Sequence, residues 1–393
     1  MTGWVHAIRH GWVVTGRVPG PDVDEFADAA EVTAALARSS CGDDTLLAVQ
    51  HPHRTPAALA GGLSLADALP AARQALERLR ASAYRPVADV VAPYRVAGPD
   101  GVAVGVLCLV DSAAVDVRGM SLIRHSEEIY PQVVTERAAM LAGLRCATSA
   151  AMLVPVNGGE RLTAAVLGCI GGLGPPPVST TDSGGRTHQL WLLGPGAEQD
   201  VVRAAVARNP LLVADGNHRV AAAVASDRSA LLALVTAGPA LRIGAIHRAL
   251  VDTGLRCGDL ATAWRGVGLT VRKVTGLKPP LLPGSVVARA GDGDLLVTLP
   301  PPGSGEPLPR IDHALVERLL IAEALGIDPE GPQVRALPAG RPAGAHVDVV
   351  VQLAPVPFAD VLAVHEQGRR MPRKSTYFTP KPRSGLLLAD LTS

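Results

Sequence analysis

The chain has few aromatic residues and no long apolar run. Aromatic residues make up 3% of its 393 residues, whereas 41 glycines and 33 prolines lie among many alanines, valines and leucines. We therefore expect a core of small aliphatic side chains and loops with many turns. No stretch reaches the roughly 18 apolar residues that span a bilayer, and the N-terminus lacks an apolar segment followed by a small-residue cleavage site. Neither secretion nor membrane insertion is expected.

An excess of charge of either sign is also missing. The chain carries 37 basic and 36 acidic side chains, a formal net charge of +1. Bulk electrostatics therefore give no support to nucleic-acid binding. Hydrophobic residues make up 48% and charged residues 19%, which excludes a disordered chain, and the length allows one large or two ordinary domains.

Cysteine is sparse and unpaired in the sequence. An odd total of five with no CxxC pair argues against a disulfide framework or a zinc site and favours reduced, mostly buried thiols. This usage predicts a cytoplasmic protein. The cysteines are Cys41, Cys108, Cys146, Cys169 and Cys257.

Hydrophobic periodicity predicts strands and helices that mix without a strict βαβ alternation, which favours an α+β fold with mixed sheets. Turn sequences GPDG and GDGD indicate two hairpins. Strands are expected over 46–50, 88–96, 102–110, 151–156, 189–193, 211–214, 229–236, 285–299 as a hairpin, and 347–353. Helices are expected over 65–79, 133–144, 198–208, 259–267 and 358–366, with one more capped by Asp312. We divide the chain into an N-terminal α/β region (1–115), a core (116–300) and a C-terminal region that packs on the core (301–393).

The sequence DGNHR at 215–219 follows an apolar strand and opens an alanine-rich helix. Backbone N–H groups point out of a helix N-terminus, which makes this turn a natural anion site. His218 and Arg219 would add donors. The alternative interpretation is that Asp215 only caps the helix and that Arg219 is a solvated side chain.

The segment RRMPRKSTYFTPKPRSG near the C-terminus concentrates lysine. The chain has four lysines against 33 arginines, and two of them, Lys374 and Lys381, lie within eight residues. Tyr377 and Phe378 lie between these two lysines. The segment is therefore a basic, hydroxyl-rich loop with a stacking surface, which suits the phosphates and the base of a nucleotide. A basic surface segment with one buried aromatic pair is the alternative. The segment is no Walker A loop, since Lys374-Ser375 lacks the preceding glycine.

Two adjacent carboxylates follow a histidine in His125-Ser126-Glu127-Glu128, a loop before a helix. A carboxylate there could act as a general base or hold a magnesium ion, although charged loop residues are usually solvated. Other histidines and glycines show no such pattern. His51-Pro-His53, His188 and the GCIGGLG stretch at 168–174 are interpreted as structural.

Taken in order, these motifs resemble the bacterial family called domain of unknown function 1015, whose members are similar to the ParB/sulfiredoxin-like free serine kinases. DGNHR at 215–219 matches that group's aspartate-glycine-histidine-histidine-arginine motif, and MPRKSTYFTPK at 371–381 matches its lysine- and threonine-containing loop. LRIGAIHR at 241–248 and LWLL at 190–193 are also similar. The resemblance implies a ParB/sulfiredoxin-like core.

The resemblance also implies roles for individual residues. Ahead of the core, the family's usual pattern has a histidine-glutamate pair, then a proline, then an aspartate-arginine pair. Aligning that proline with Pro131 places Glu127 at the glutamate and Arg137 at the arginine. Glu127 would then be the base on the substrate hydroxyl, and Asp215 would assist at a magnesium ion or at the hydroxyl, with His218 as the third catalytic residue. The implied ligands of the nucleotide, ATP or ADP, are Gly216, Asn217, Arg219, Arg137, Lys374, Ser375, Thr376 and Lys381.

The chain departs from the family at Asn217, where a histidine is usual, and in an N-terminal region without the proline-proline-tyrosine-aspartate stretch. Asparagine donates a hydrogen bond but carries neither charge nor a proton. The expected function is a kinase-like enzyme that transfers phosphate from a nucleotide to the hydroxyl of free serine or a similar small amino acid. A nucleotide-binding regulator without phosphoryl transfer is the alternative. A DNA-binding relative of ParB is disfavoured by the net charge.

Overall fold

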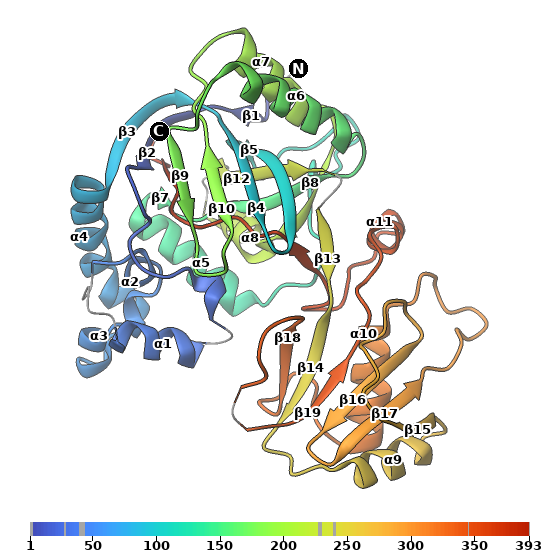
Figure 1. Cartoon of the computed structure of the whole chain (residues 1–393). Coiled ribbons are helices and arrows are strands. Elements are labelled where there is room, and N and C mark those ends of the chain that lie inside the picture. Colours follow the sequence, from blue (N-terminus) through green and yellow to red (C-terminus); the bar gives the residue numbers. More distant parts are fainter. Residues whose placement is uncertain are drawn as a thin grey trace. The chain divides into compact units, whose positions relative to one another are not determined.

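The computed structural model describes residues 3–26, 29–38, 44–226, 230–238, 241–344 and 346–392 (Figure 1). The chain forms two compact units. The first consists of Met1–His125, Ile129–Leu241 and Thr379–Ser393, and the second of Ser126–Glu128 and Arg242–Phe378. The expected segment boundaries after residues 115 and 300 fall inside the first and the second unit. The α+β class with mixed sheets is confirmed.

The larger sheet of the first unit is mixed. Its β8–β12 and β6–β11 neighbours are parallel, and its other paired neighbours are antiparallel. The expected GPDG hairpin is present, because β4 and β5 pair from Ala92↔Leu107 to Gly98↔Gly101. The strands follow the order β6 (Ile123–Arg124), β11 (Leu211–Asp215), β8 (Ala151–Pro155), β12 (Ala230–Ala237), β5 (Gly101–Asp111), β4 (Ala92–Gly98), β10 (Thr187–Leu190) and β9 (Val178–Thr181), with β1 (Val5–His6) paired to β5.

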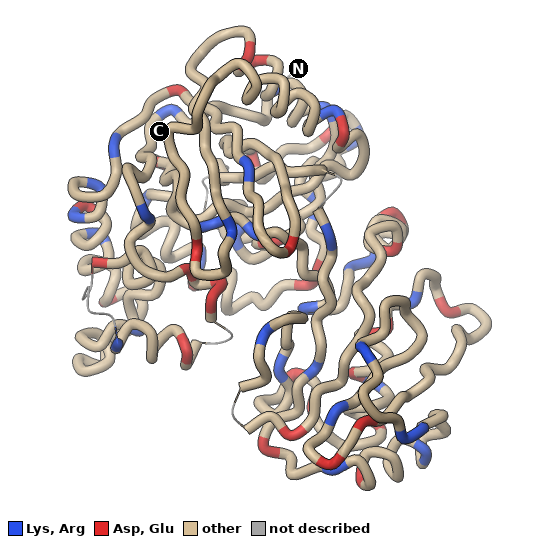
Figure 2. Tube along the Cα trace, viewed as in Figure 1, with Lys and Arg blue, Asp and Glu red and all other residues tan. Residues whose placement is uncertain are grey.

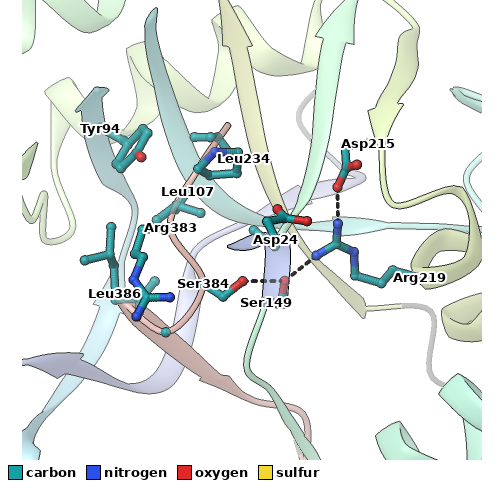
Figure 3. A pocket seen from close by; sticks show the side chains of 14 residues that line it. Asp24, Tyr94, Leu107, Ser149, Asp215, Arg219, Leu234, Arg383, Ser384 and Leu386 are labelled. Carbon is teal, nitrogen blue, oxygen red and sulfur yellow. Dashed lines mark hydrogen bonds and ion pairs between the residues drawn. The ribbon is translucent and has the colours of Figure 1, made fainter. Parts of the chain in front are cut away.

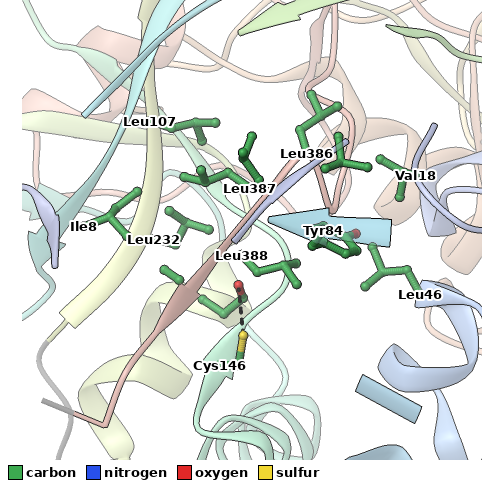
Figure 4. Packing of buried hydrophobic residues seen from close by; sticks show 14 of the residues in the cluster. Ile8, Val18, Leu46, Tyr84, Leu107, Cys146, Leu232, Leu386, Leu387 and Leu388 are labelled. Carbon is green, nitrogen blue, oxygen red and sulfur yellow. Dashed lines mark hydrogen bonds between the residues drawn. The ribbon is translucent and has the colours of Figure 1, made fainter. Parts of the chain in front are cut away.

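A second sheet of this unit is completed by the end of the chain. β21 (Leu387–Asp390) lies between β2 (Ile8–Val14) and β7 (Cys146–Ala147), and β3 (Tyr84–Val90) pairs with the other edge of β2. The expected strand over 88–96 is split between β3 and β4, which belong to different sheets. Figure 4 shows Leu387 and Leu388 of β21 among the apolar side chains of the cluster. The C-terminal strand therefore supplies part of the core of the first unit.

The expected strand over 46–50 is wrong, because these residues form helix α2 (Leu46–Gln50). The Thr45 side chain accepts a hydrogen bond from the Ala48 amide and caps this helix, and the segment is buried on every side. A short helix with no exposed face has no helical periodicity to recognise.

Most of the other helices of the first unit follow the apolar pattern. Three helices were not expected: α1, α3 and α6, of which α6 has a glycine-rich sequence that weakens its helical pattern and leads into the stretch interpreted as turns. The helices are α1 (Ala29–Arg38), α3 (Pro56–Ala60), α4 (Leu65–Ala83), α5 (Pro131–Leu144), α6 (Gly159–Gly172), α7 (Ala197–Ala207) and α8 (Asn217–Ala225).

The second unit packs helices against one sheet around Trp264, which is fully buried and donates its indole N–H to the Leu320 carbonyl at 2.9 Å. The expected GDGD hairpin is present as β16 and β17. Asp312 does not cap its helix as expected; its carboxylate accepts the Gly284 amide at 2.7 Å instead. The sheet order is β15 (Thr270–Val274), β17 (Gly293–Thr298), β16 (Ser285–Ala290), β19 (Val347–Gln352), β14 (Ile246–Val251) and β18 (Val334–Pro338). The helices are α9 (Cys257–Gly266), α10 (Asp312–Leu315) with a π-helical continuation over Val316–Glu323, and α11 (Phe358–Glu366); the short strands β13 (Arg242–Gly244) and β20 (Tyr377–Thr379) pair with each other.

The expectations drawn from composition can be compared with the described residues. Cys108, Cys146, Cys169 and Cys257 are free and buried, and Cys41 lies outside the described residues. In the same part of the chain, no helix combines the length and the apolar character needed to cross a membrane. Figure 2 shows basic and acidic residues interspersed along both units, in keeping with the net charge of +1.

A buried ion pair ties the two ends of the first unit together. Arg383 lies 2.8 Å from a carboxylate oxygen of Asp22, and their side chains are 8% and 6% exposed. The same carboxylate accepts the Ser384 amide at 2.8 Å, and Asp22 also caps the short helical turn Val23–Glu25. Removing one partner of a buried pair leaves an uncompensated charge.

We predict that Asp22→Ala lowers the free energy of unfolding by about 3–5 kcal/mol, because it leaves the buried Arg383 charge and the Ser384 amide without the carboxylate that they contact. Urea denaturation of the whole chain measures this. The control is Asp44→Ala, whose pair with Arg78 is half-exposed and should contribute about 0–1 kcal/mol. Equal losses in the two variants would contradict a special role for the buried pair.

Candidate functional site

The DGNHR sequence forms the expected strand, turn and helix. β11 ends at Asp215, Gly216 adopts a φ of +94°, and α8 begins at Asn217. A Cβ atom on Gly216 would lie 2.6 Å from Nε of Arg219, so glycine is required both by conformation and by space. The first backbone N–H groups of α8 have no partner within the helix and form an anion-binding terminus.

Asp215 lies between two cations, Lys381 and Arg219, and Figure 3 shows its contact with Arg219. Lys381 contacts one of its carboxylate oxygens at 2.7 Å, and Arg219 donates to the other. Arg219 also donates to the Ser149 hydroxyl, which lies 3.1 Å from the hydroxyl of Ser384. The two motifs chosen from the sequence thus meet within the first unit, since Lys381 belongs to the C-terminal segment.

Two carboxylates share Lys381. Its ammonium lies 2.7 Å from Asp215 and 3.7 Å from Asp24, a residue that sequence reasoning did not select. A cavity of about 20 Å³ lies beside this cluster, with Asp24, Ser149 and Arg219 among its lining residues. This volume holds about one water molecule, so a phosphate would bind at the helix terminus and not inside the cavity.

Asn217 and His218 have contacts inside the protein. The Oδ1 atom of Asn217 lies 3.1 Å from Nδ1 of His125, and Asn217 is 8% exposed. The Tyr130 amide donates to Nε2 of His218 at 2.9 Å, and the two rings stack 5.9 Å apart. Because Nε2 accepts this bond, it carries no hydrogen. His218 thereby holds Tyr130, the residue before α5.

A magnesium site at Asp215 is not supported by the surrounding side chains. Both of its carboxylate oxygens contact cations, and no group of three histidine, cysteine, aspartate or glutamate residues suited to a metal ion occurs in the described ranges. Magnesium is bound by oxygen ligands, often one or two carboxylates together with substrate phosphates. The described residues by themselves do not provide a metal centre, and the assignment of Asp215 to magnesium stays a prediction.

The remaining expected residues lie in the second unit. Glu127 accepts two hydrogen bonds from Thr376, from the amide at 3.1 Å and the hydroxyl at 2.7 Å, and a third from the Lys374 amide at 3.3 Å. The Met371 amide donates to the Ser126 carbonyl at 2.8 Å and joins the same two segments. The HSEE loop and the KST loop (residues 373–376) therefore contact each other.

A buried arginine, Arg248, holds the KST loop through two of its backbone carbonyls. Arg248 is 2% exposed, forms an ion pair with Glu317 at 2.6 Å and donates to the carbonyls of Arg373 and Lys374, both at 3.1 Å. Lys374 adopts a φ of +50°, and its side chain is exposed. Ser375 is fully buried and donates to the Pro372 carbonyl at 2.6 Å, so its hydroxyl shapes the turn and is not available to a nucleotide.

The expected site residues thus fall into two groups, one in each unit. Arg137 belongs to the first unit and lines its larger cavity; burial lowers its pKa, and Arg219 lies close enough for its charge to lower that pKa further. Sequence reasoning missed Asp24, Ser149, Ser384 and Arg248. Arg248 lies in the LRIGAIHR segment noted for its resemblance, which was the one available signal.

Residues 90–263 match the family model described as Protein of unknown function (DUF1015). The resemblance inferred from the motifs is confirmed over this range, which contains the HSEE loop and DGNHR but not the KST loop. No curated protein matches the chain.

Solved structures resemble the chain only weakly. SbnI with a C-terminal truncation, from Staphylococcus aureus, has 15% sequence identity and a TM-score of 0.41, and the match covers 72% of this chain and 87% of that one. A free serine kinase in complex with AMP has 11% identity and a TM-score of 0.35, with 67% and 88% covered. A conserved hypothetical protein from Pyrococcus furiosus has 10% identity and a TM-score of 0.36, with 67% and 89% covered. No activity follows from likenesses of this degree.

We predict that Glu127→Ala accelerates hydrogen exchange at the amides of Lys374 and Thr376 by about tenfold or more, because both amides lose their acceptor. Exchange followed by mass spectrometry over residues 371–378 measures this. Glu128→Ala is the control, since the Glu128 carboxylate is exposed and lies 3.8 Å from Arg373. Equal acceleration in both variants would show that the loop does not depend on Glu127.

Proposed function

We propose that the chain is a kinase that transfers a phosphoryl group from ATP or ADP to the hydroxyl of free serine or a similar small amino acid. The bond from phosphorus to the leaving oxygen of the nucleotide breaks, the acceptor oxygen forms the new bond, and the hydroxyl proton passes to a base. This chemistry needs aligned reactants, cations against the phosphates and one proton acceptor.

The observation that carries the proposal is the meeting of Arg219 and Lys381 at the N-terminus of α8. Two side-chain cations and the N-terminus of a helix favour an anion such as a nucleotide phosphate. Gly216 allows a phosphate to approach the backbone, since it carries no Cβ. Asp215 holds both cations in place. Glu127 is proposed as the base because of the resemblance, and the KST loop that it holds presents the exposed Lys374.

A nucleotide-binding regulator without phosphoryl transfer is the second candidate. It is favoured by the Glu127 carboxylate, which accepts three hydrogen bonds, and by Asp215, whose oxygens contact cations. Either candidate fits the cytoplasmic location that we propose from the buried free thiols. Nucleotide turnover with and without serine distinguishes the two.

We predict that Lys381→Gln and Arg219→Gln each weaken nucleotide binding by about 10- to 100-fold, the loss expected for one charge-assisted hydrogen bond of about 1.5–3 kcal/mol. Calorimetric titration of the whole chain with ADP and ATP, with magnesium present, measures this. Lys278→Gln is the control, because Lys278 is exposed and belongs to the second unit. Equal effects of all three substitutions would indicate diffuse attraction to basic residues instead of a site.

We also predict that Glu127→Gln lowers phosphoryl transfer to serine by about 10²- to 10⁴-fold and leaves nucleotide affinity nearly unchanged. Glutamine keeps an acceptor for Thr376 but takes up no proton. Single-turnover formation of phosphoserine measures the step. Unchanged turnover would remove Glu127 from the mechanism, and the absence of transfer in the unmodified chain despite nucleotide binding would favour the regulator.

A further inference from the structure

The first unit contains a second, larger cavity that the residues discussed so far leave without a role. Its volume is about 320 Å³, within the range of small-molecule pockets and far above the 20 Å³ beside Asp215. It is lined by α1, α5 and the chain around the short helical turn Pro52–Arg54. Asp24 lines both cavities. The larger cavity is therefore adjacent to the cluster around Lys381.

Four of the polar side chains of the lining are basic or imidazole groups: His51, His53, Arg54 and Arg137. The Nε2 atom of His51 and the Nδ1 atom of His53 are buried and have no hydrogen-bond partner within the described ranges. A buried polar atom without a partner costs free energy, about 1–3 kcal/mol. The two histidines that sequence analysis set aside as structural are therefore unsatisfied groups at a cavity.

The charged groups of the lining are two arginines and two carboxylates, and Arg137 is deeply buried near both carboxylates, which act to raise its pKa. Burial, followed by the charges of Arg137 and Arg54, lowers the pKa of His51 to about 3, so the ring is neutral and has one N–H to donate. Burial likewise lowers the pKa of Arg137, which nevertheless stays charged. Two carboxylates also line the cavity, but Asp24 lies 3.7 Å from Lys381 and Glu136 is exposed.

The rest of the lining is largely apolar and includes Phe26, Leu65, Val133 and Met140. Free serine has too few carbon atoms to contact these apolar side chains and the basic side chains at the same time. An apolar body with a single anionic group matches both parts of the lining. The planar guanidinium group of Arg137 suits a carboxylate, which it can bind through two parallel hydrogen bonds.

We propose that this cavity binds a small organic carboxylate with an apolar body, whose carboxylate is held by Arg137, Arg54 and His51. That such a compound is the phosphoryl acceptor, an amino acid or hydroxy acid longer than serine, rests on the proposed function. Binding of the carboxylate itself does not, so the two can fail separately.

Calorimetric titration of the whole chain with hexanoate, butanoate and hexanamide tests the proposal, with ADP titrated separately. Hexanoate should bind about tenfold more tightly than butanoate, because two buried methylene groups contribute about 0.8 kcal/mol each. Hexanamide should bind at least about tenfold more weakly than hexanoate, because it lacks the charge. Inorganic phosphate, the comparison anion, should not compete with hexanoate.

Arg137→Gln should weaken hexanoate binding by about tenfold or more, and Arg54→Gln provides a second variant should the first fail to fold. The control is Arg145→Gln, which changes an exposed arginine at the end of the same helix. The proposal is overturned if hexanamide binds as well as hexanoate, if the control loses as much affinity as Arg137→Gln, or if hexanoate does not bind to a chain that binds ADP. Loss of ADP binding with hexanoate binding intact would instead overturn the proposed function alone.

Discussion

The return of the C-terminal segment to the first unit is the constraint on which the candidate site depends. β21 completes the sheet between β2 and β7, and the residues just before it bring Lys381 to Asp215 and Arg383 to Asp22. Apolar burial of β21 supplies the driving force, whereas the ion pairs set the position of the segment, because buried charges are tolerated only when paired. The cations proposed to bind phosphate are thus assembled only when a strand from the end of the chain is in place.

The polypeptide changes unit within or next to the segments that the motifs single out. It passes between units at His125–Ser126 in the HSEE loop, at Leu241–Arg242 in LRIGAIHR and at Phe378–Thr379 in the KSTYF segment. Within the second unit, Arg248, Glu127 and the KST loop form one bonded network. These contacts therefore stabilise the part of the second unit next to the crossings, a structural role that exists whether or not the residues bind a ligand.

Sequence periodicity predicted elements whose burial is one-sided. The helix over 358–366 has a buried face and a more exposed one. The hairpin of β4 and β5 was found instead from two β-rich runs and the GPDG turn, since most residues of both strands are buried. The helix over 46–50 was mistaken for a strand, since all of its residues are buried, and α6 was missed, since glycines weaken its helical signal. The Asp312 cap failed because its carboxylate bonds to the distant Gly284, a partner that local sequence does not reveal.

The candidate site follows the same rule. DGNHR could be recognised because strand, turn and helix are contiguous, whereas Asp24, Ser149 and Ser384 enter only through long-range packing. His51 was set aside because two histidines spaced by a proline match no metal pattern, and its significance comes from a cavity that tertiary structure creates.

The contacts of Asn217 change how the replacement of the motif's usual histidine is interpreted. A histidine at this position of the motif would suggest a phosphate ligand or a proton carrier, and its loss a damaged site. Asn217 is 8% exposed, however, and its amide oxygen lies 3.1 Å from the ring of His125. The side chain thus faces the protein and joins the turn to the HSEE loop within the first unit. A neutral amide fulfils that role without the cost of burying a charge, while Arg219 and Lys381 keep the positive charge at the helix terminus.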